Sequence, residues 1–130
     1  GFAGKDDFEA AWVDAIGDQF KDYFVELQPH LAVVVGVRVG DKEMAKKAAK
    51  TVATKFLPFL EKRLWESRTC FLVGNGLTWI DLHLADHVDV LNNLFPDFLD
   101  DYPKVLAHSA KVRSEPKLKE YLEKRPERYF

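Results

Sequence analysis

The fold of this chain is decided by the stretch Phe71-Leu72-Val73-Gly74-Asn75-Gly76-Leu77-Thr78-Trp79-Ile80-Asp81. Its glycine-asparagine-glycine centre is typical of a turn. Thr78 is a favoured residue at the N-cap of a helix, and Asp81 can accept a hydrogen bond from the Thr78 backbone amide, as in a capping box. The stretch therefore predicts a turn followed by a helix that begins at Thr78. For Thr78 and Asp81 it predicts a structural role, in which Asp81→Ala costs about 1 kcal/mol of folding stability.

Apolar residues on both sides of this stretch recur with helical spacing. They predict helices over about residues 6–31, 41–66, 78–95, 102–114 and 116–125. In the first helix the apolar positions follow steps of three and four: Phe8, Trp12, Ile16, Phe20, Phe24, Leu27 and Leu31. Proline disturbs a helix, so we expect Pro29 to kink or interrupt the first segment and Pro58 to bend the second. Five helices with short connections predict an all-α domain, a five-helix bundle.

The valine-rich run at residues 33–40 has the composition of a β-strand. A strand needs a partner for its backbone hydrogen bonds, and the sequence contains no second strand-like run. We therefore interpret this run as a distorted end of the first helix that leads into a loop at Gly40-Asp41.

The composition is that of one globular domain. The 130 residues include 47% hydrophobic and 31% charged side chains, and the net charge is −2. This charge argues against nucleic acid or an anionic membrane as the main partner, and the longest apolar run, residues 31–35, is too short to span a bilayer. The single cysteine, Cys70, excludes an internal disulfide and fits a reducing compartment. We expect it to pack as a small hydrophobic residue.

Three acidic residues, Asp14, Asp18 and Asp22, are spaced four apart on the first helix. Like charges at this spacing lie on one helix face and repel each other. We therefore expect a cation to compensate at least one of them. This cation can be a Lys or Arg of a packed helix, a metal ion, or the ammonium group of a ligand; simple solvation of the three carboxylates is the alternative.

His83 and His87 are also four apart, a spacing that can hold zinc. Leu84 stands where the general-base glutamate of a metalloprotease would follow the first histidine, and no third ligand is obvious. We therefore expect no metal site.

Six segments in this order resemble the all-helical C-terminal domain of cytosolic glutathione transferases. They are residues 1–6, similar to the connector after the thioredoxin-like domain, residues 9–18, similar to the first helix, residues 71–81, Asp101-Tyr102-Pro103, and the tail segments 112–118 and 124–126. Among the classes of the family, the chain looks most like sigma and most like its nematode members. The resemblance covers the whole chain and implies that residues 1–5 end the interdomain connector. It also implies that the N-terminal thioredoxin-like domain is absent from this chain.

The resemblance implies an enzyme that joins reduced glutathione to small apolar electrophiles in detoxification. It implies a cytoplasmic homodimer, with glutathione as co-substrate and no other cofactor. In this family a tyrosine or serine of the thioredoxin-like domain stabilises the glutathione thiolate. We therefore expect no catalytic residue in this chain, and no activity from the chain alone.

The resemblance also assigns binding residues. An aspartate at the position of Asp22 reaches across the dimer toward the γ-glutamyl ammonium of the glutathione bound to the neighbouring subunit. The electrophile pocket of the family lies between the two domains. Its wall is expected to include Gln28, Pro29, Ala32 and Phe130.

Two other interpretations remain open. The chain can be a non-enzymatic module of glutathione-transferase-like fold that binds apolar ligands or another protein, and its aromatic content of 13% suits binding. It can also be a structural, crystallin-like descendant of such a domain. A thioredoxin-like half upstream, with a tyrosine near its start, would favour the enzyme, and an unrelated upstream domain would favour the module.

Overall fold

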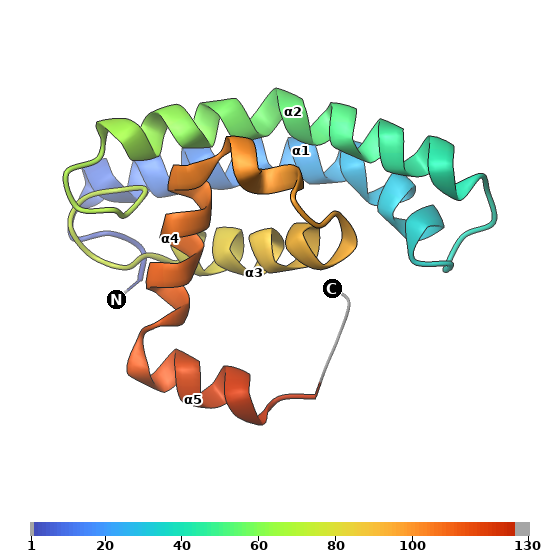
Figure 1. The fold of residues 1–130 in the computed structure, drawn as a ribbon. Coiled ribbons are helices and arrows are strands. Elements are labelled where there is room, and N and C mark those ends of the chain that lie inside the picture. Colours follow the sequence, from blue (N-terminus) through green and yellow to red (C-terminus); the bar gives the residue numbers. More distant parts are fainter. Residues whose placement is uncertain (1, 127–130) are drawn as a thin grey trace.

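The computed structural model describes residues 2–126, in which the chain forms five α-helices, one short 3₁₀-helix and no strand. The elements are α1 (Asp7–Val34), α2 (Lys42–Glu66), α3 (Trp79–Leu94), η1 (Phe98–Asp101), α4 (Pro103–Arg113) and α5 (Pro116–Lys124). The two long helices α1 and α2 lie side by side, α3 runs beneath them, and α4 crosses from α2 toward α5 (Figure 1). The predicted all-α, five-helix fold is confirmed.

Acidic side chains determine where the long helices begin. Asp6 and Asp41 cap α1 and α2 by accepting hydrogen bonds of 2.9–3.1 Å from backbone N–H groups of the first turns. Helix α4 begins with Pro103 and has no side-chain cap of its own. Its first turn is capped by Glu61 of α2, whose two carboxylate oxygens accept hydrogen bonds of 2.9 Å from the N–H groups of Lys104 and Val105. This contact fixes α4 against α2.

Pro29 and Pro58 do not end the helices that contain them. Helix α1 continues three residues past Leu31, where the sequence predicted its end. Proline removes one backbone donor, but Leu27 and Leu31 on either side of Pro29 are both buried in the core, and their burial favours an unbroken helix. After α1 the chain turns at Gly36, which has a φ of +85°, and the rest of the valine-rich run forms the loop to α2, as interpreted from the sequence.

The buried face of α1 differs from the predicted stripe. Its buried residues are Val13, Ile16, Phe20, Tyr23, Leu27 and Leu31. Phe8 is 73% exposed, Trp12 41% and Phe24 38%. An α-helix has 3.6 residues per turn, so repeated steps of four drift by about 40° each around the axis, whereas alternating steps of three and four stay on one face. The apolar residues spaced four apart from Phe8 to Phe24 therefore rotate away from the buried face at both ends of the series.

The connection between α2 and α3 also corrects one expectation. Cys70 is exposed and has a left-handed φ of 68°, so the expectation that it packs as a small hydrophobic residue is wrong. The adjacent Leu72 and Val73 take the buried positions in this loop. The short helix η1 was not predicted either, because a single turn is too short to show periodicity.

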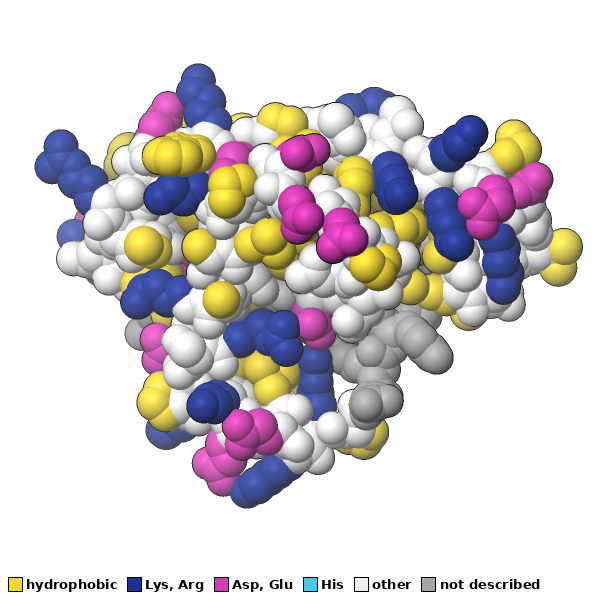
Figure 2. Space-filling view, viewed as in Figure 1, with side chains coloured by type: hydrophobic (Ala, Val, Ile, Leu, Met, Phe, Trp, Pro, Cys, Tyr) yellow, Lys and Arg dark blue, Asp and Glu magenta, His cyan; other side chains and the backbone are white. Residues whose placement is uncertain are grey.

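No helix within residues 2–126 is long and apolar enough to cross a membrane. On the face shown in Figure 2, basic and acidic side chains are interspersed. This mixed surface agrees with the small net charge of −2.

Candidate functional site

A cavity of about 530 Å³ opens between the C-terminal half of α1 and helix α3. Most of its walls are apolar, formed by Phe20, Phe24, Leu31, Ala32, Val35, Val37, Val90 and Leu94. Four polar side chains complete the lining: Gln28, His83, Asp86 and His87. A largely apolar cavity of this size with a few polar groups is the usual form of a small-molecule site.

Helical spacing brings these residues to one side of the fold. Phe20, Phe24 and Gln28 recur at steps of four along α1, and His83 and His87 do so along α3. Side chains at this spacing lie on one helix face. Because α1 and α3 pack against each other, the two faces enclose the cavity. The half-exposed Phe24, which does not belong to the core face, therefore forms part of the cavity wall.

Tyr23 of α1 and His87 of α3 form a buried hydrogen bond at the cavity, with 2.6 Å between Tyr23 Oη and His87 Nε2. The rings of Phe20 and Phe56 pack edge-on against Tyr23. Burial lowers the pKa of His87 to about 3, with a smaller contribution from the neighbouring His83. Burial also raises the pKa of Tyr23 well above its ordinary value. Both side chains are therefore neutral at pH 7.

The residues predicted for an electrophile pocket are distributed unevenly. Gln28 and Ala32 line the cavity. Pro29 is half-buried on α1 but is not among the lining residues, because one residue step rotates a side chain by about 100° around the helix. Phe130 lies outside the described residues.

Asp14, Asp18 and Asp22 are all exposed on α1. Within residues 2–126, none of the three forms an ion pair with a Lys or Arg. The lysine or arginine partner that the spacing suggested is thus not found in the part of the chain that the structure describes. Asp22 does not line the cavity.

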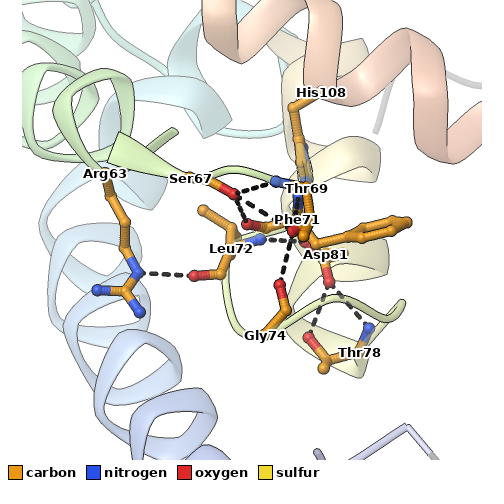
Figure 3. A network of polar contacts seen from close by, with 9 residues as sticks. All are labelled: Arg63, Ser67, Thr69, Phe71, Leu72, Gly74, Thr78, Asp81 and His108. Atoms are coloured by element: carbon orange, nitrogen blue, oxygen red, sulfur yellow. Dashed lines mark hydrogen bonds and ion pairs between the residues drawn. The ribbon is translucent and has the colours of Figure 1, made fainter. Parts of the chain in front are cut away.

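Asp81 is fully buried and lies at the centre of a second polar cluster (Figure 3). Its Oδ2 accepts hydrogen bonds from the backbone N–H of Thr78 at 2.8 Å and from the Thr78 hydroxyl at 2.9 Å. Its Oδ1 accepts one from the backbone N–H of Leu72 at 3.0 Å and lies 2.7 Å from His108 Nε2. The predicted contact of Asp81 with the Thr78 amide is confirmed, and the carboxylate also ties the loop before α3 and helix α4 to the start of α3.

The environment of Asp81 determines its charge. Burial alone raises the pKa of this carboxyl, but the hydrogen bonds from His108, Leu72 and Thr78 outweigh burial and hold its pKa below the ordinary value. Asp81 is therefore ionised at pH 7, and His108 Nε2 carries the proton that it donates to Oδ1. The other ring nitrogen, His108 Nδ1, is buried without a hydrogen-bond partner in the described residues.

The sequence did not reveal the Tyr23–His87 and Asp81–His108 contacts. His87 attracted attention only through its spacing from His83, as a metal pair, and no group of three or more His, Cys, Asp or Glu residues in the described chain could hold a metal ion. One signal was present: His87 shares the apolar face of α3 with Leu84 and Leu91. A histidine on such a face is expected to be buried and to need a polar partner.

Comparison with known proteins gives this fold and cavity a context. The family model described as "Glutathione S-transferase, C-terminal domain" matches residues 30–125. A Caenorhabditis elegans protein named probable glutathione S-transferase 6 is 40% identical over 131 residues, an alignment that covers 100% of this chain and 64% of the relative. This chain thus spans less than two thirds of the length of that relative.

Solved structures agree with the sequence comparisons. The crystal structure of monomeric Na-GST-3, a glutathione S-transferase from the hookworm Necator americanus, has a TM-score of 0.93 and 42% identity, and covers 100% of this chain and 64% of its own. A Nu-class GST from Haemonchus contortus has a TM-score of 0.85 and 41% identity, and covers 100% of this chain and 63% of its own. With the family match over residues 30–125, these similarities show that the chain belongs to the glutathione S-transferase C-terminal domain family.

Proposed function

We propose that this chain is the helical half of a glutathione transferase and that the cavity between α1 and α3 receives the apolar electrophile. The observation that carries the proposal is the cavity itself. A member of this family presents about 530 Å³ of mostly apolar space, and Gln28 and Ala32, assigned to the electrophile wall by position, both line it. Apolar walls favour an apolar acceptor and exclude water from the reacting atoms.

In the proposed reaction, the glutathione thiolate attacks an electrophilic carbon of the bound acceptor. A sulfur–carbon bond forms, and the displaced electron pair leaves with the departing group or moves into the acceptor. The group that stabilises the thiolate would belong to the thioredoxin-like domain. The contribution of this chain is to bind and orient the acceptor against the apolar faces of α1 and α3.

A fusion experiment tests this proposal. The chain alone is expected to give no glutathione-dependent turnover of a chromogenic aryl chloride. Joined to a thioredoxin-like domain of a glutathione transferase that carries the thiolate-stabilising tyrosine, it is expected to give turnover that depends on that tyrosine. The matched control is the same fusion with that tyrosine changed to phenylalanine. A fusion that is folded and binds glutathione, yet does not turn over, would favour a non-enzymatic ligand-binding module instead.

Asp22 is proposed to contact the glutathione ammonium of a neighbouring subunit. It is exposed on α1 and has no ion pair in the described chain, so its carboxylate is accessible to a ligand cation. In the active fusion, Asp22→Ala is expected to raise the glutathione KM about tenfold, because a charge-assisted hydrogen bond is lost. The thermal midpoint should stay within the experimental error. Asp18→Ala, one helical turn away, is the matched control, and an unaltered KM in Asp22→Ala would exclude this role.

The role of Asp22 requires a second subunit, so we also propose a homodimer. The similar hookworm protein is described as monomeric, which makes the assembly state of the active fusion a direct measurement. We further propose a cytoplasmic protein of the nematode branch of the family that acts in detoxification. The sequence favoured the sigma class for this branch, whereas the similar Haemonchus contortus protein is described as Nu-class.

A further inference from the structure

We propose that His87 is a fixed hydrogen-bond donor in the wall of the cavity, and that it selects apolar ligands that carry a carbonyl oxygen. The inference rests on one part of the proposed function, namely that the cavity binds substrates. It adds the chemical class of the ligand. Its basis is the hydrogen bond between Tyr23 and His87 and the mostly apolar lining of the cavity, in which Gln28, His83 and Asp86 are the other polar side chains.

The Tyr23 hydroxyl determines which nitrogen of His87 carries the proton. This hydroxyl is buried, and its hydrogen bond in the described chain is to His87 Nε2, at 2.6 Å. A buried hydroxyl proton needs an acceptor, so Tyr23 donates and Nε2 accepts. A neutral imidazole that accepts at one nitrogen donates at the other. His87 is neutral near pH 7, because burial lowers its pKa to about 3, so its proton lies on Nδ1.

The Nδ1–H group is available to a ligand. His87 lines the cavity, and its described hydrogen bond is made through Nε2. The buried side-chain nitrogen that lacks a partner in residues 2–126 belongs to His108, not to His87. His87 Nδ1 therefore keeps access to the cavity.

The surroundings of this donor make it selective. Phe20 packs edge-on against the His87 ring, with 5.1 Å between ring centroids, and Phe24 lies 6.1 Å from it. A ligand that enters this space leaves water behind, and an unpaired N–H then costs free energy unless the ligand supplies an acceptor. An apolar molecule with a carbonyl oxygen satisfies both the walls and the donor. The neutral state of His87 means that it offers a hydrogen bond and no charge, which disfavours a preference for carboxylates.

The first test measures the proton on His87 directly. Long-range ¹H–¹⁵N NMR of the chain at pH 7 is expected to show His87 neutral and protonated on Nδ1. In Tyr23→Phe, which keeps the ring and removes the hydroxyl, His87 should no longer prefer this tautomer. A charged His87, or a proton on Nε2 in the unmodified chain, would overturn the proposal.

The second test measures ligand selection with acetophenone and cumene, which differ by a carbonyl oxygen in place of a methyl group. Dissociation constants come from NMR shifts of residues around the cavity, without glutathione. The ratio of the cumene to the acetophenone dissociation constant is expected to fall about 3- to 10-fold in His87→Leu. In His83→Leu, a matched change at an exposed lining histidine, the ratio should stay the same.

An unchanged ratio in His87→Leu, an equal fall in His83→Leu, or no shift at the cavity with either ligand would each overturn the proposal. If His87→Leu does not fold, Tyr23→Phe serves in its place, with a smaller fall expected because the donor is no longer fixed. Neither test involves turnover. An inactive fusion protein with intact carbonyl selection would therefore refute the proposed transferase function and leave the role of His87 standing.

Discussion

Replacing Asp81 by alanine is expected to lower the free energy of unfolding of this chain by about 3–5 kcal/mol. A helix cap alone is worth about 1 kcal/mol, which was the expectation from sequence. The larger figure follows from the fully buried carboxylate, which accepts hydrogen bonds from the Thr78 amide and hydroxyl, the Leu72 amide and His108. Alanine would leave all of these donors buried and unpaired.

The measurement is urea unfolding of the chain at pH 7, followed by circular dichroism. Asp81→Asn, which keeps the shape but places an amide N–H₂ among donors, should fall between Asp81→Ala and the unmodified chain. Asp14→Ala, at an exposed position of α1, is the control and should change stability by less than about 0.5 kcal/mol. A loss of 1 kcal/mol or less in Asp81→Ala would mean that the cluster contributes no more than a cap.

Because of His87, lowering the pH is expected to destabilise this chain already at pH values well above the range in which carboxylates titrate. The pKa of His87 is about 3 in the folded chain, whereas an unfolded histidine has a pKa of about 6.5. Between these values the unfolded state binds one more proton than the folded state, so the free energy of unfolding falls as the pH falls. Above about pH 6.5 the free energy of unfolding is not reduced by His87. Below this pH it decreases by about 1.4 kcal/mol per pH unit because of His87.

The comparison is between the unmodified chain and the double variant Tyr23→Phe/His87→Leu. This variant removes both partners of the buried hydrogen bond, so it leaves no orphan hydroxyl. From pH 7 to pH 4.5 the unmodified chain should lose roughly 3 kcal/mol more than the double variant. His30→Gln is the control and should keep the full loss. Equal losses in the unmodified chain and the double variant would show that His87 does not cause the pH dependence of the free energy of unfolding.

The contribution of Asp81 falls in a different pH window. Its folded pKa lies below the ordinary value because of the hydrogen bonds from His108, Leu72 and Thr78, which outweigh burial. A depressed carboxyl pKa contributes stability that is present above the unfolded pKa, about 3.9, and is lost as the pH falls through the folded pKa. The two groups can therefore be separated by titration: His87 acts from about pH 6.5 downward and Asp81 only below about pH 4.

Much of this fold was predictable from sequence because it depends on neighbours along the chain. The aspartate caps of α1 and α2 and the contact of Asp81 with the Thr78 amide join residues within three positions of each other. Helical spacing gave the five helices and most of their ends. The first helix was predicted to be interrupted or kinked at Pro29 and to end near Leu31, but it runs unbroken to Val34 because the burial of Leu27 and Leu31, a property of the packed fold, outweighs one lost backbone donor.

In the candidate site, too, some features follow from the sequence and others only from the packing of the helices. The family resemblance named Gln28 and Ala32 for an electrophile pocket; both line the cavity, and their role in binding an electrophile stays a prediction. Pro29, named with them, does not line it, since only the rotation of α1 against α3 decides which side chains face the space between them. That rotation also places Phe24 in the cavity wall rather than in the core.

The sequence by itself determined the helices, the start of α3 and the family, since each of these is written in residues close together along the chain. Only the tertiary structure decided which polar groups meet. Tyr23 and His87 are 64 positions apart, and Asp81 and His108 are 27 apart. No local pattern links such residues, because a hydrogen bond between them forms only after helices have packed. Burial makes these hydrogen bonds necessary, because a polar group that is removed from water must find its partner within the fold.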